Sequence, residues 1–144
     1  MPKRDWDPIR GRLRVSTDLY REQLLDHYHN PQNFGQLETP DINIEMDNPT
    51  CGDSVHMTAN LDAEGRIARV MFEGEGCVIS MAASSMLTEE LVGKKPEQVA
   101  AMGLADIQEM MGGIRLSMGR VKCALLALNA MKEGLEQAGK LTSD

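Results

Sequence analysis

Apolar and polar residues alternate in the middle of the chain. The alternation runs over residues 42–47 and again over residues 54–61, and a period of two is typical of strands with one buried face. Residues 63–65, Ala-Glu-Gly, predict a turn, and residues 67–72 predict a third strand. Short connections between consecutive strands favour an antiparallel meander.

The segments on either side of the strands have helical spacing and helix-stopping residues. Thr17 or Asp18 can cap a first helix that ends near His29, before Asn30-Pro31. Further helices are predicted over residues 80–91, 96–102 and 104–111, and a long amphipathic one over about 121–135. Strands and helices are therefore segregated along the chain. The predicted class is α+β: a small three-stranded antiparallel sheet with helices packed on one face, the N-terminal helix first and the long C-terminal helix last.

The first residues differ in charge from the rest of the chain. Five basic residues and two aspartates give residues 1–14 a balance of +3, whereas the whole chain carries −7. We expect residues 1–16 to form a flexible basic tail, with a docking arm as the alternative, and residues 17–144 to form one domain. The acidic body argues against nucleic-acid binding, and no apolar run is long enough to span a membrane.

The cysteine content points to metal chemistry in a reducing compartment. No secretory signal is visible, so a cytoplasmic protein is expected, where cysteines bind metals or react more often than they form disulfides. The chain has three cysteines, an odd number that cannot pair completely within one chain. Three thiolates and one carboxylate can, however, complete a four-ligand metal site.

Two of these cysteines are predicted to meet at one end of the sheet. Cys51 and Asp53 lie in the turn between the first two predicted strands, with Gly52 allowing a sharp bend. Cys77 follows the third strand, and two antiparallel reversals bring it to the same end of the sheet. It also precedes a predicted helix, whose N-terminal N–H groups and dipole favour a thiolate.

Cys123 is expected in the first turn of the last helix, where Arg120 and Lys122 add positive charge that favours the thiolate. Any one of these cysteines could be a small buried apolar residue. Their common position at element ends instead indicates one site made by Cys51, Asp53, Cys77 and Cys123. Such a site suits zinc or an iron–sulfur cluster, and Asp53 would hold a soft cluster more weakly than a fourth thiolate does.

The histidines are expected to lie outside this site. His27 and His29 fall near the end of the first helix, where interaction with its last carbonyls or with solvent is expected. His56 lies on the polar face of the second strand and is not predicted to reach the metal. The sequence shows no catalytic triad, phosphate-binding loop or HExxH motif.

Four ordered motifs resemble the IscU/SufU/NifU-N-terminal family of iron–sulfur cluster assembly scaffolds. They are residues 20–35 with His-Tyr-His-Asn-Pro and Phe-Gly, residues 48–53 with Asn-Pro-Thr-Cys-Gly-Asp, residues 72–80 with Phe-Glu-Gly-Glu-Gly-Cys and a later Ser, and Lys122-Cys123-Ala124. The resemblance spans about residues 18–138. It implies an IscU-like scaffold domain in which the three cysteines are the sulfur ligands and Asp53 is the carboxylate ligand.

The resemblance also implies partners and cargo. A cysteine desulfurase would donate sulfur as a persulfide, with Cys123 as the expected first acceptor because basic residues flank it. Iron would complete a labile [2Fe–2S] cluster, which would pass to apo iron–sulfur proteins or carriers, while the apo site would bind zinc. Two subunits of a homo-oligomer could share one cluster.

The sequence departs from both subfamilies. Residues 116–120 read Leu-Ser-Met-Gly-Arg where IscU proteins have Leu-Pro-Pro-Val-Lys, and Lys122 replaces a histidine, so handover by an Hsp70-type chaperone is not supported. The last motif is SufU-like, but the SufU insertion between the second and third cysteines is lacking. We therefore expect a scaffold or carrier rather than an enzyme. The alternatives are a zinc-bound SufU-type sulfurtransferase and a structural zinc domain that only binds partners.

Overall fold

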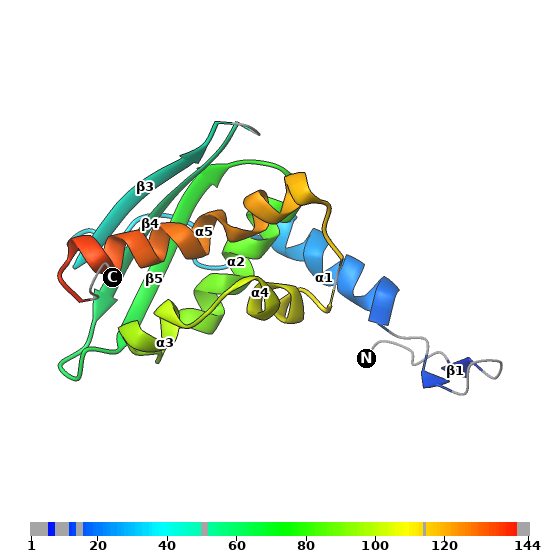
Figure 1. Ribbon diagram of the computed structural model, residues 1–144, viewed down its shortest axis with the longest axis horizontal. Coiled ribbons are helices and arrows are strands. Elements are labelled where there is room, and N and C mark those ends of the chain that lie inside the picture. The colour runs from blue at the N-terminus through cyan, green and yellow to red at the C-terminus, as the bar shows by residue number, and fades with distance from the viewer. Residues whose placement is uncertain (1–5, 8–11, 14–15, 50–51, 114, 141–144) are drawn as a thin grey trace.

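A three-stranded antiparallel sheet forms one layer of the protein. The computed structural model describes residues 6–7, 12–13, 16–49, 52–113 and 115–140, with side chains from residue 22 onward. The sheet consists of β3 (Ile42–Asn48), β4 (Asp53–Leu61) and β5 (Ile67–Glu75), and β4 is the central strand (Figure 1). The predicted meander is confirmed, although β5 continues three residues beyond the predicted end.

The register of the sheet brings the ends of all three strands together. Asn48 at the end of β3 lies opposite Asp53, and Ser54 lies opposite Glu75 at the end of β5. A register shift near Asn60 gives β5 one extra residue close to Ile67. This bulge explains why the alternation of buried residues in β5 restarts after Ile67.

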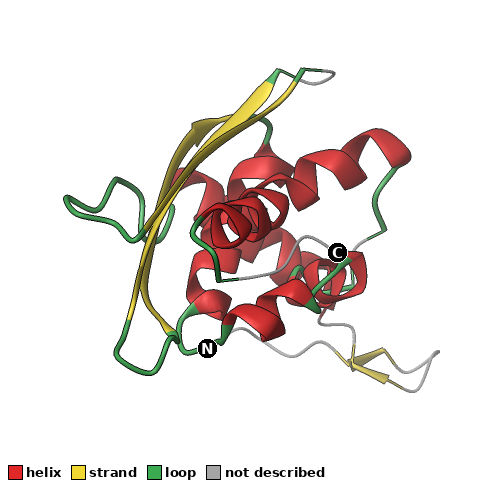
Figure 2. Ribbon diagram, turned by 60° about the vertical axis from the view of Figure 1, so that its left-hand side comes forward, coloured by secondary structure: helices red, strands yellow, loops and turns green. Residues whose placement is uncertain are grey.

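The described residues form five helices, which follow the predicted order and lie on one side of the sheet (Figure 2). They are α1 (Ser16–His29), α2 (Val78–Leu91), α3 (Pro96–Ala100), α4 (Leu104–Met110) and α5 (Met118–Gln137). The predicted fold class is therefore confirmed. Some boundaries were wrong: α1 begins before Thr17 and Asp18, so neither residue caps it, and α3 ends two residues before Met102.

The hydrophobic core lies between the sheet and the two long helices. Helix α5 packs against β3 and β4, and α2 packs against β5 and α5. Gly134 brings α5 close to the sheet, because a Cβ there would lie 2.6 Å from Ile42 Cγ2. Methionines fill the aliphatic interior beside few aromatic rings. Fully buried examples include Met57, Met111 and Met131.

The segment after α1 is fixed to both α2 and β5. The Gly35 N–H donates to Phe72 O at 2.8 Å, and the Phe72 N–H donates to Asn33 O at 3.0 Å, so this segment covers the edge of β5. His27 Nδ1 lies 2.6 Å from Ser85 Oγ, which also accepts from the Gln32 N–H at 2.7 Å. The expectation for His27 was therefore wrong: its ring docks α1 onto α2 instead of interacting with helix-end carbonyls or solvent.

The N-terminal segment contains two short paired strands, β1 (Trp6–Asp7) and β2 (Arg12–Leu13). They stand apart from the sheet and the packed helices (Figure 1). Most of the expected tail lies outside the described residues, so its flexibility and the boundary at residue 16 stay predictions. Among the described helices, none has the length and apolar character that a membrane span requires.

Candidate metal centre

Three of the four predicted ligands meet at one end of the sheet. The ligand atoms of Asp53, Cys77 and Cys123 all lie within 4.8 Å of one another. The fourth, Cys51, lies outside the described residues, so its membership of the site stays a prediction. Its neighbour Gly52 has a φ of +74°, which is the left-handed bend expected of that glycine.

Asp53 is the first residue of β4 and is almost completely buried, with 3% of its surface exposed. Its Oδ2 atom has no hydrogen-bond partner among the described residues. Burial of a carboxylate oxygen without a partner is costly, and a bound cation would remove that cost. The state of Asp53 therefore fits a metal ligand better than a structural hydrogen-bonding residue.

Cys77 is the N-cap residue of α2, as the sequence predicted. Its Sγ accepts a hydrogen bond from the Ser80 N–H at 3.4 Å, and the residue is half-buried. The preceding Gly76 leaves room for the carboxylate, because a Cβ there would lie 2.9 Å from Asp53 Oδ1 and 3.0 Å from Ser80 Oγ. Gly76 therefore chiefly clears space for the side chain of Asp53.

Cys123 lies in the second turn of α5, not in the first as expected, because the helix begins at Met118. It is 3% exposed, and its thiol donates to Gly119 O at 3.6 Å within the helix. The field of a helix N-terminus is strongest in the first turn, so it acts less on Cys123 than on Cys77. Arg120 lies one turn earlier and faces the same cavity, whereas Lys122 is exposed and does not line it.

A cavity of 270 Å³ connects these donors to the surface and is lined by Asp53, Cys77, Ser117, Gly119, Arg120 and Cys123. In a tetrahedral zinc site with metal–sulfur bonds of about 2.3 Å, ligand atoms stand about 3.8 Å apart. The observed limit of 4.8 Å therefore requires only small movements to close around a metal. Two soft sulfurs and one hard oxygen suit zinc or iron.

His56 does not belong to this site, as expected. Its Nε2 lies 2.5 Å from Asn43 Oδ1 and its Nδ1 lies 3.7 Å from Glu45, on the face of the sheet opposite the helices. Two contributions to the site were not assigned from the sequence: the N–H of Ser80 at Cys77, and Ser117 in the cavity wall. The position of Ser80 three residues after the N-cap is the signal that could have found the first.

Comparison with known proteins shows the family of this chain. The model of the NifU-like N terminal domain matches residues 19–141. The chain belongs to this family. The match includes the sheet, helices α2 to α5 and all but the first three residues of α1.

Two curated members of the NifU-like family carry different descriptions. The zinc-dependent sulfurtransferase SufU of Bacillus subtilis (strain 168) is 38% identical, over 81% of this chain and 89% of that protein. The iron–sulfur cluster assembly scaffold protein IscU of Streptococcus pyogenes serotype M1 is 35% identical, over 88% of each chain. A crystal structure of SufU from thermophilic Fervidobacterium islandicum AW-1 superposes with a TM-score of 0.68, at 26% identity over 83% of this chain and 98% of that one.

Proposed function

We propose that this protein is a scaffold for de novo iron–sulfur cluster assembly. It accepts sulfur from a cysteine desulfurase, combines it with iron, holds a labile [2Fe–2S] cluster and transfers that cluster to apo-proteins or carriers. The cluster is the cargo, and the protein is a carrier rather than an enzyme. The observation that carries the proposal is a buried carboxylate oxygen of Asp53, without a hydrogen-bond partner in the described part of the chain, beside two cysteine sulfurs.

The proposed ligands are Cys51, Asp53, Cys77 and Cys123. Clusters that stay bound are usually held by four thiolates. A carboxylate is a harder ligand that binds the same iron more weakly, so the Asp53 position is the one that exchanges most readily. A scaffold requires such a position because its cluster must leave, whereas an electron-transfer protein gains nothing from it.

Sulfur would reach the site as a persulfide. We propose that the thiolate of Cys123 attacks the terminal sulfur of a desulfurase persulfide. A new S–S bond forms on Cys123, the S–S bond of the donor breaks, and the donor cysteine leaves as a thiolate. Arg120 in the cavity wall stabilises the attacking thiolate. Because Cys123 is buried, the donor sulfur has to enter through the 270 Å³ cavity.

The second candidate is a zinc-bound sulfurtransferase that accepts persulfide sulfur and passes it on. The specific observation in its favour is the compact placement of Asp53, Cys77 and Cys123, which needs little movement to enclose one zinc ion. The SufU relative from Bacillus subtilis, described as a zinc-dependent sulfurtransferase, supports the same candidate. In this case zinc would hold the cysteines in place, and no cluster would form.

Anaerobic reconstitution separates the two candidates. The protein is incubated with iron, cysteine and a cysteine desulfurase, and visible absorption is followed before and after addition of an apo-ferredoxin. A scaffold develops a cluster chromophore, which then appears on the ferredoxin. Cys77→Ser should abolish a stable chromophore, and Ser54→Ala, a neighbour of Asp53 on β4, should not.

The opposite result is equally clear. Zinc that iron cannot displace, no chromophore under any condition, and faster desulfurase turnover on addition of the protein would identify a sulfurtransferase. That outcome would overturn the scaffold proposal and leave the metal-site proposal intact.

A further inference from the structure

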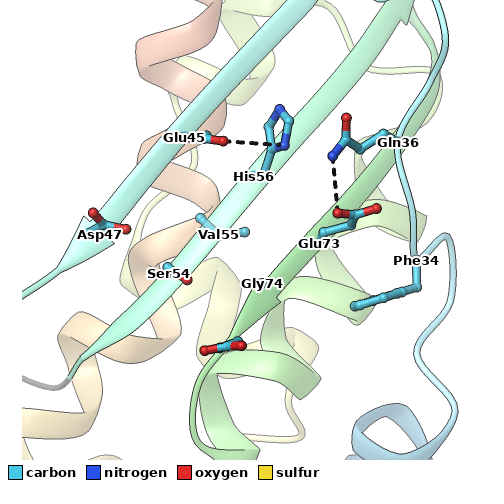
Figure 3. A pocket seen from close by; sticks show the side chains of 10 residues that line it. Phe34, Gln36, Glu45, Asp47, Ser54, Val55, His56, Glu73 and Gly74 are labelled. Atoms are coloured by element: carbon cyan, nitrogen blue, oxygen red, sulfur yellow. Dashed lines mark hydrogen bonds and ion pairs between the residues drawn. The ribbon is translucent and has the colours of Figure 1, made fainter.

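The face of the sheet opposite the helices carries a hollow of 430 Å³. Carboxylates from the two outer strands line it, namely Glu45 and Asp47 on β3 and Glu73 and Glu75 on β5, around His56 and Ser54 on β4 (Figure 3). We call this feature the acidic hollow. It lies on the other side of the sheet from α2 and α5, and no described helix covers it (Figure 2).

Only two of the carboxylates in the acidic hollow have a hydrogen bond or an ion pair with another described residue that lines it. Gln36 Nε2 donates to Glu73 Oε2 at 3.1 Å, and His56 Nδ1 lies 3.7 Å from Glu45, whose side chain is 77% exposed. Among the residues whose side chains the structure describes, no lysine or arginine lines the hollow. Four carboxylates with one histidine therefore produce a concentrated negative potential in a concave surface, which favours a cationic ligand.

An aromatic side chain stands at the rim of the same hollow. Phe34 is 47% exposed, although its ring packs edge-on against Phe72 with centroids 5.4 Å apart. An occupant that combined positive charge with an apolar side chain would match both features of the acidic hollow.

The N-terminal segment, residues 1–14, has this combination. It carries Lys3, Arg4 and three further arginines against two aspartates, and it also contains Trp6 and Leu13. Its charge is +3 in a chain of −7, so the remaining residues carry −10. The positive charge of residues 1–14 is thus opposite in sign to the charge of the rest of the chain.

The short connection between β2 and α1 indicates that an N-terminal segment bound in the acidic hollow belongs to a second copy of the chain. β2 ends at Leu13, only two residues before α1 begins at Ser16, and three Cα–Cα steps span at most about 11 Å. The paired strands β1 and β2 lie beside the start of α1, on the side of the molecule away from the sheet (Figure 1 and Figure 2). This short connection keeps β2 beside the start of α1, so the segment is better placed to meet another copy than the acidic hollow of its own chain.

We propose that the acidic hollow binds the basic N-terminal segment of a second copy of this chain. Two copies can exchange segments reciprocally, which gives a closed dimer with two equivalent contacts. Because these contacts are mainly between exposed charges, the dimer weakens as salt increases. The proposal requires no metal and is independent of the function proposed above.

Sedimentation velocity of the full chain tests this dimer, with EDTA present so that metal cannot bridge two copies. We expect concentration-dependent dimerisation at about 50 mM salt and a dissociation constant at least about tenfold larger at about 500 mM. The double variant Glu45→Lys/Glu73→Lys should weaken dimerisation at least about tenfold. The matched control Glu133→Lys/Glu136→Lys places the same charges on exposed positions of α5 and should dimerise like the wild type.

A charge swap makes the test specific. Arg10→Glu/Arg12→Glu, in the segment itself, should weaken dimerisation alone, and mixing it with Glu45→Lys/Glu73→Lys should restore a heterodimer. This variant changes no residue of the described core cluster, so it also provides a test if the strand variant folds poorly. A wild type that stays monomeric at every concentration and salt would overturn the proposal. So would dimerisation that neither pair weakens, that the control weakens equally, or that mixing fails to restore.

Discussion

At the scale of single residues, the candidate metal centre depends on how Asp53 is buried. One of its carboxylate oxygens has no partner among the residues that the structure describes; this costs free energy in the metal-free protein, and bound metal recovers that free energy. A residue kept only for stability would instead stabilise the metal-free protein, and its removal would lower the free energy of unfolding. Asp53 can therefore be tested as a ligand by stability measurements that involve no cluster assembly.

Asp53→Ala should raise the free energy of unfolding of the metal-free protein by about 1 kcal/mol, because it removes a buried polar group that has an unsatisfied atom. Zinc affinity should fall in the same variant, and a cluster assembled on it should leave more slowly, since its most exchangeable ligand is gone. Urea unfolding in EDTA, zinc competition with a chromophoric chelator, and transfer to apo-ferredoxin measure the three effects. Asp47→Ala, at an exposed position of β3, is the control. A variant that assembles no cluster at all would contradict the argument that Asp53 is the labile ligand.

Gly76 provides the space that the Asp53 carboxylate occupies. Gly76→Ala would place a Cβ 2.9 Å from Asp53 Oδ1, so the carboxylate must turn away from the two sulfurs. Zinc affinity should fall about 10–100-fold, as is usual when the surroundings of a metal ligand are disturbed. Gly103→Ala is a matched control, because a Cβ there meets no atom within 4 Å. Equal zinc affinities for the two variants, measured by chelator competition, would show that Asp53 does not bind the metal in this orientation.

At the scale of secondary-structure elements, the position of α5 on the sheet determines where Cys123 lies. Helix α5 crosses β3 and β4 at close range because Gly134 has no side chain between the helix and Ile42 and Ile44. The same helix carries Cys123 in its second turn. The packing of Gly134 against the sheet, near the C-terminal end of α5, therefore helps to fix the position of the Cys123 sulfur near the N-terminal end of the same helix.

Gly134→Ala should destabilise the protein by about 1–3 kcal/mol, because the new Cβ would lie 2.6 Å from Ile42 Cγ2. Gly119→Ala in the same helix meets no atom within 4 Å and should cause no loss of stability, since alanine has the higher helix propensity. Thermal or urea unfolding of the metal-free proteins makes the comparison. Equal stability of the two variants would show that α5 can move away from the sheet without cost.

At the scale of the whole molecule, the hydrophobic core is complete without a metal. The sheet and the helices bury a continuous aliphatic cluster, and the described ligands lie at its border. Metal binding should therefore add to the stability of a protein that is already folded, which distinguishes a scaffold from a structural zinc domain.

Removal of metal with a chelator should leave the far-UV circular dichroism spectrum and a cooperative thermal transition in place. The transition should move to lower temperature, because a ligand at about 1,000 times its dissociation constant adds about 4 kcal/mol to stability. Circular dichroism and calorimetry of the same sample before and after chelation make the measurement. Loss of the cooperative transition on chelation would instead support a structural zinc domain.

The sequence by itself determined the fold class, the order of the elements and which end of the sheet bears the site. Period-two alternation fixed β3 and β4, and antiparallel reversal then required the end of β5 to return to Asp53. Helix boundaries were predicted less well: the predicted start of α5 followed the apolar pattern from Val121, whereas the helix begins at Met118, after the N-cap residue Ser117.

Only the tertiary structure decided how the candidate ligands are arranged. The burial of Asp53, the clearance at Gly76 and the contact of His27 with Ser85 all depend on residues distant in the chain. The acidic hollow likewise combines carboxylates from two strands, separated by β4, that the sequence shows as unrelated charges. The local pattern of apolar and polar residues predicts helices and strands because residues that are neighbours in the sequence share one backbone geometry. Cavities, side-chain contacts and local electrostatic fields form where separate helices and strands pack together, and no short stretch of sequence shows how they pack.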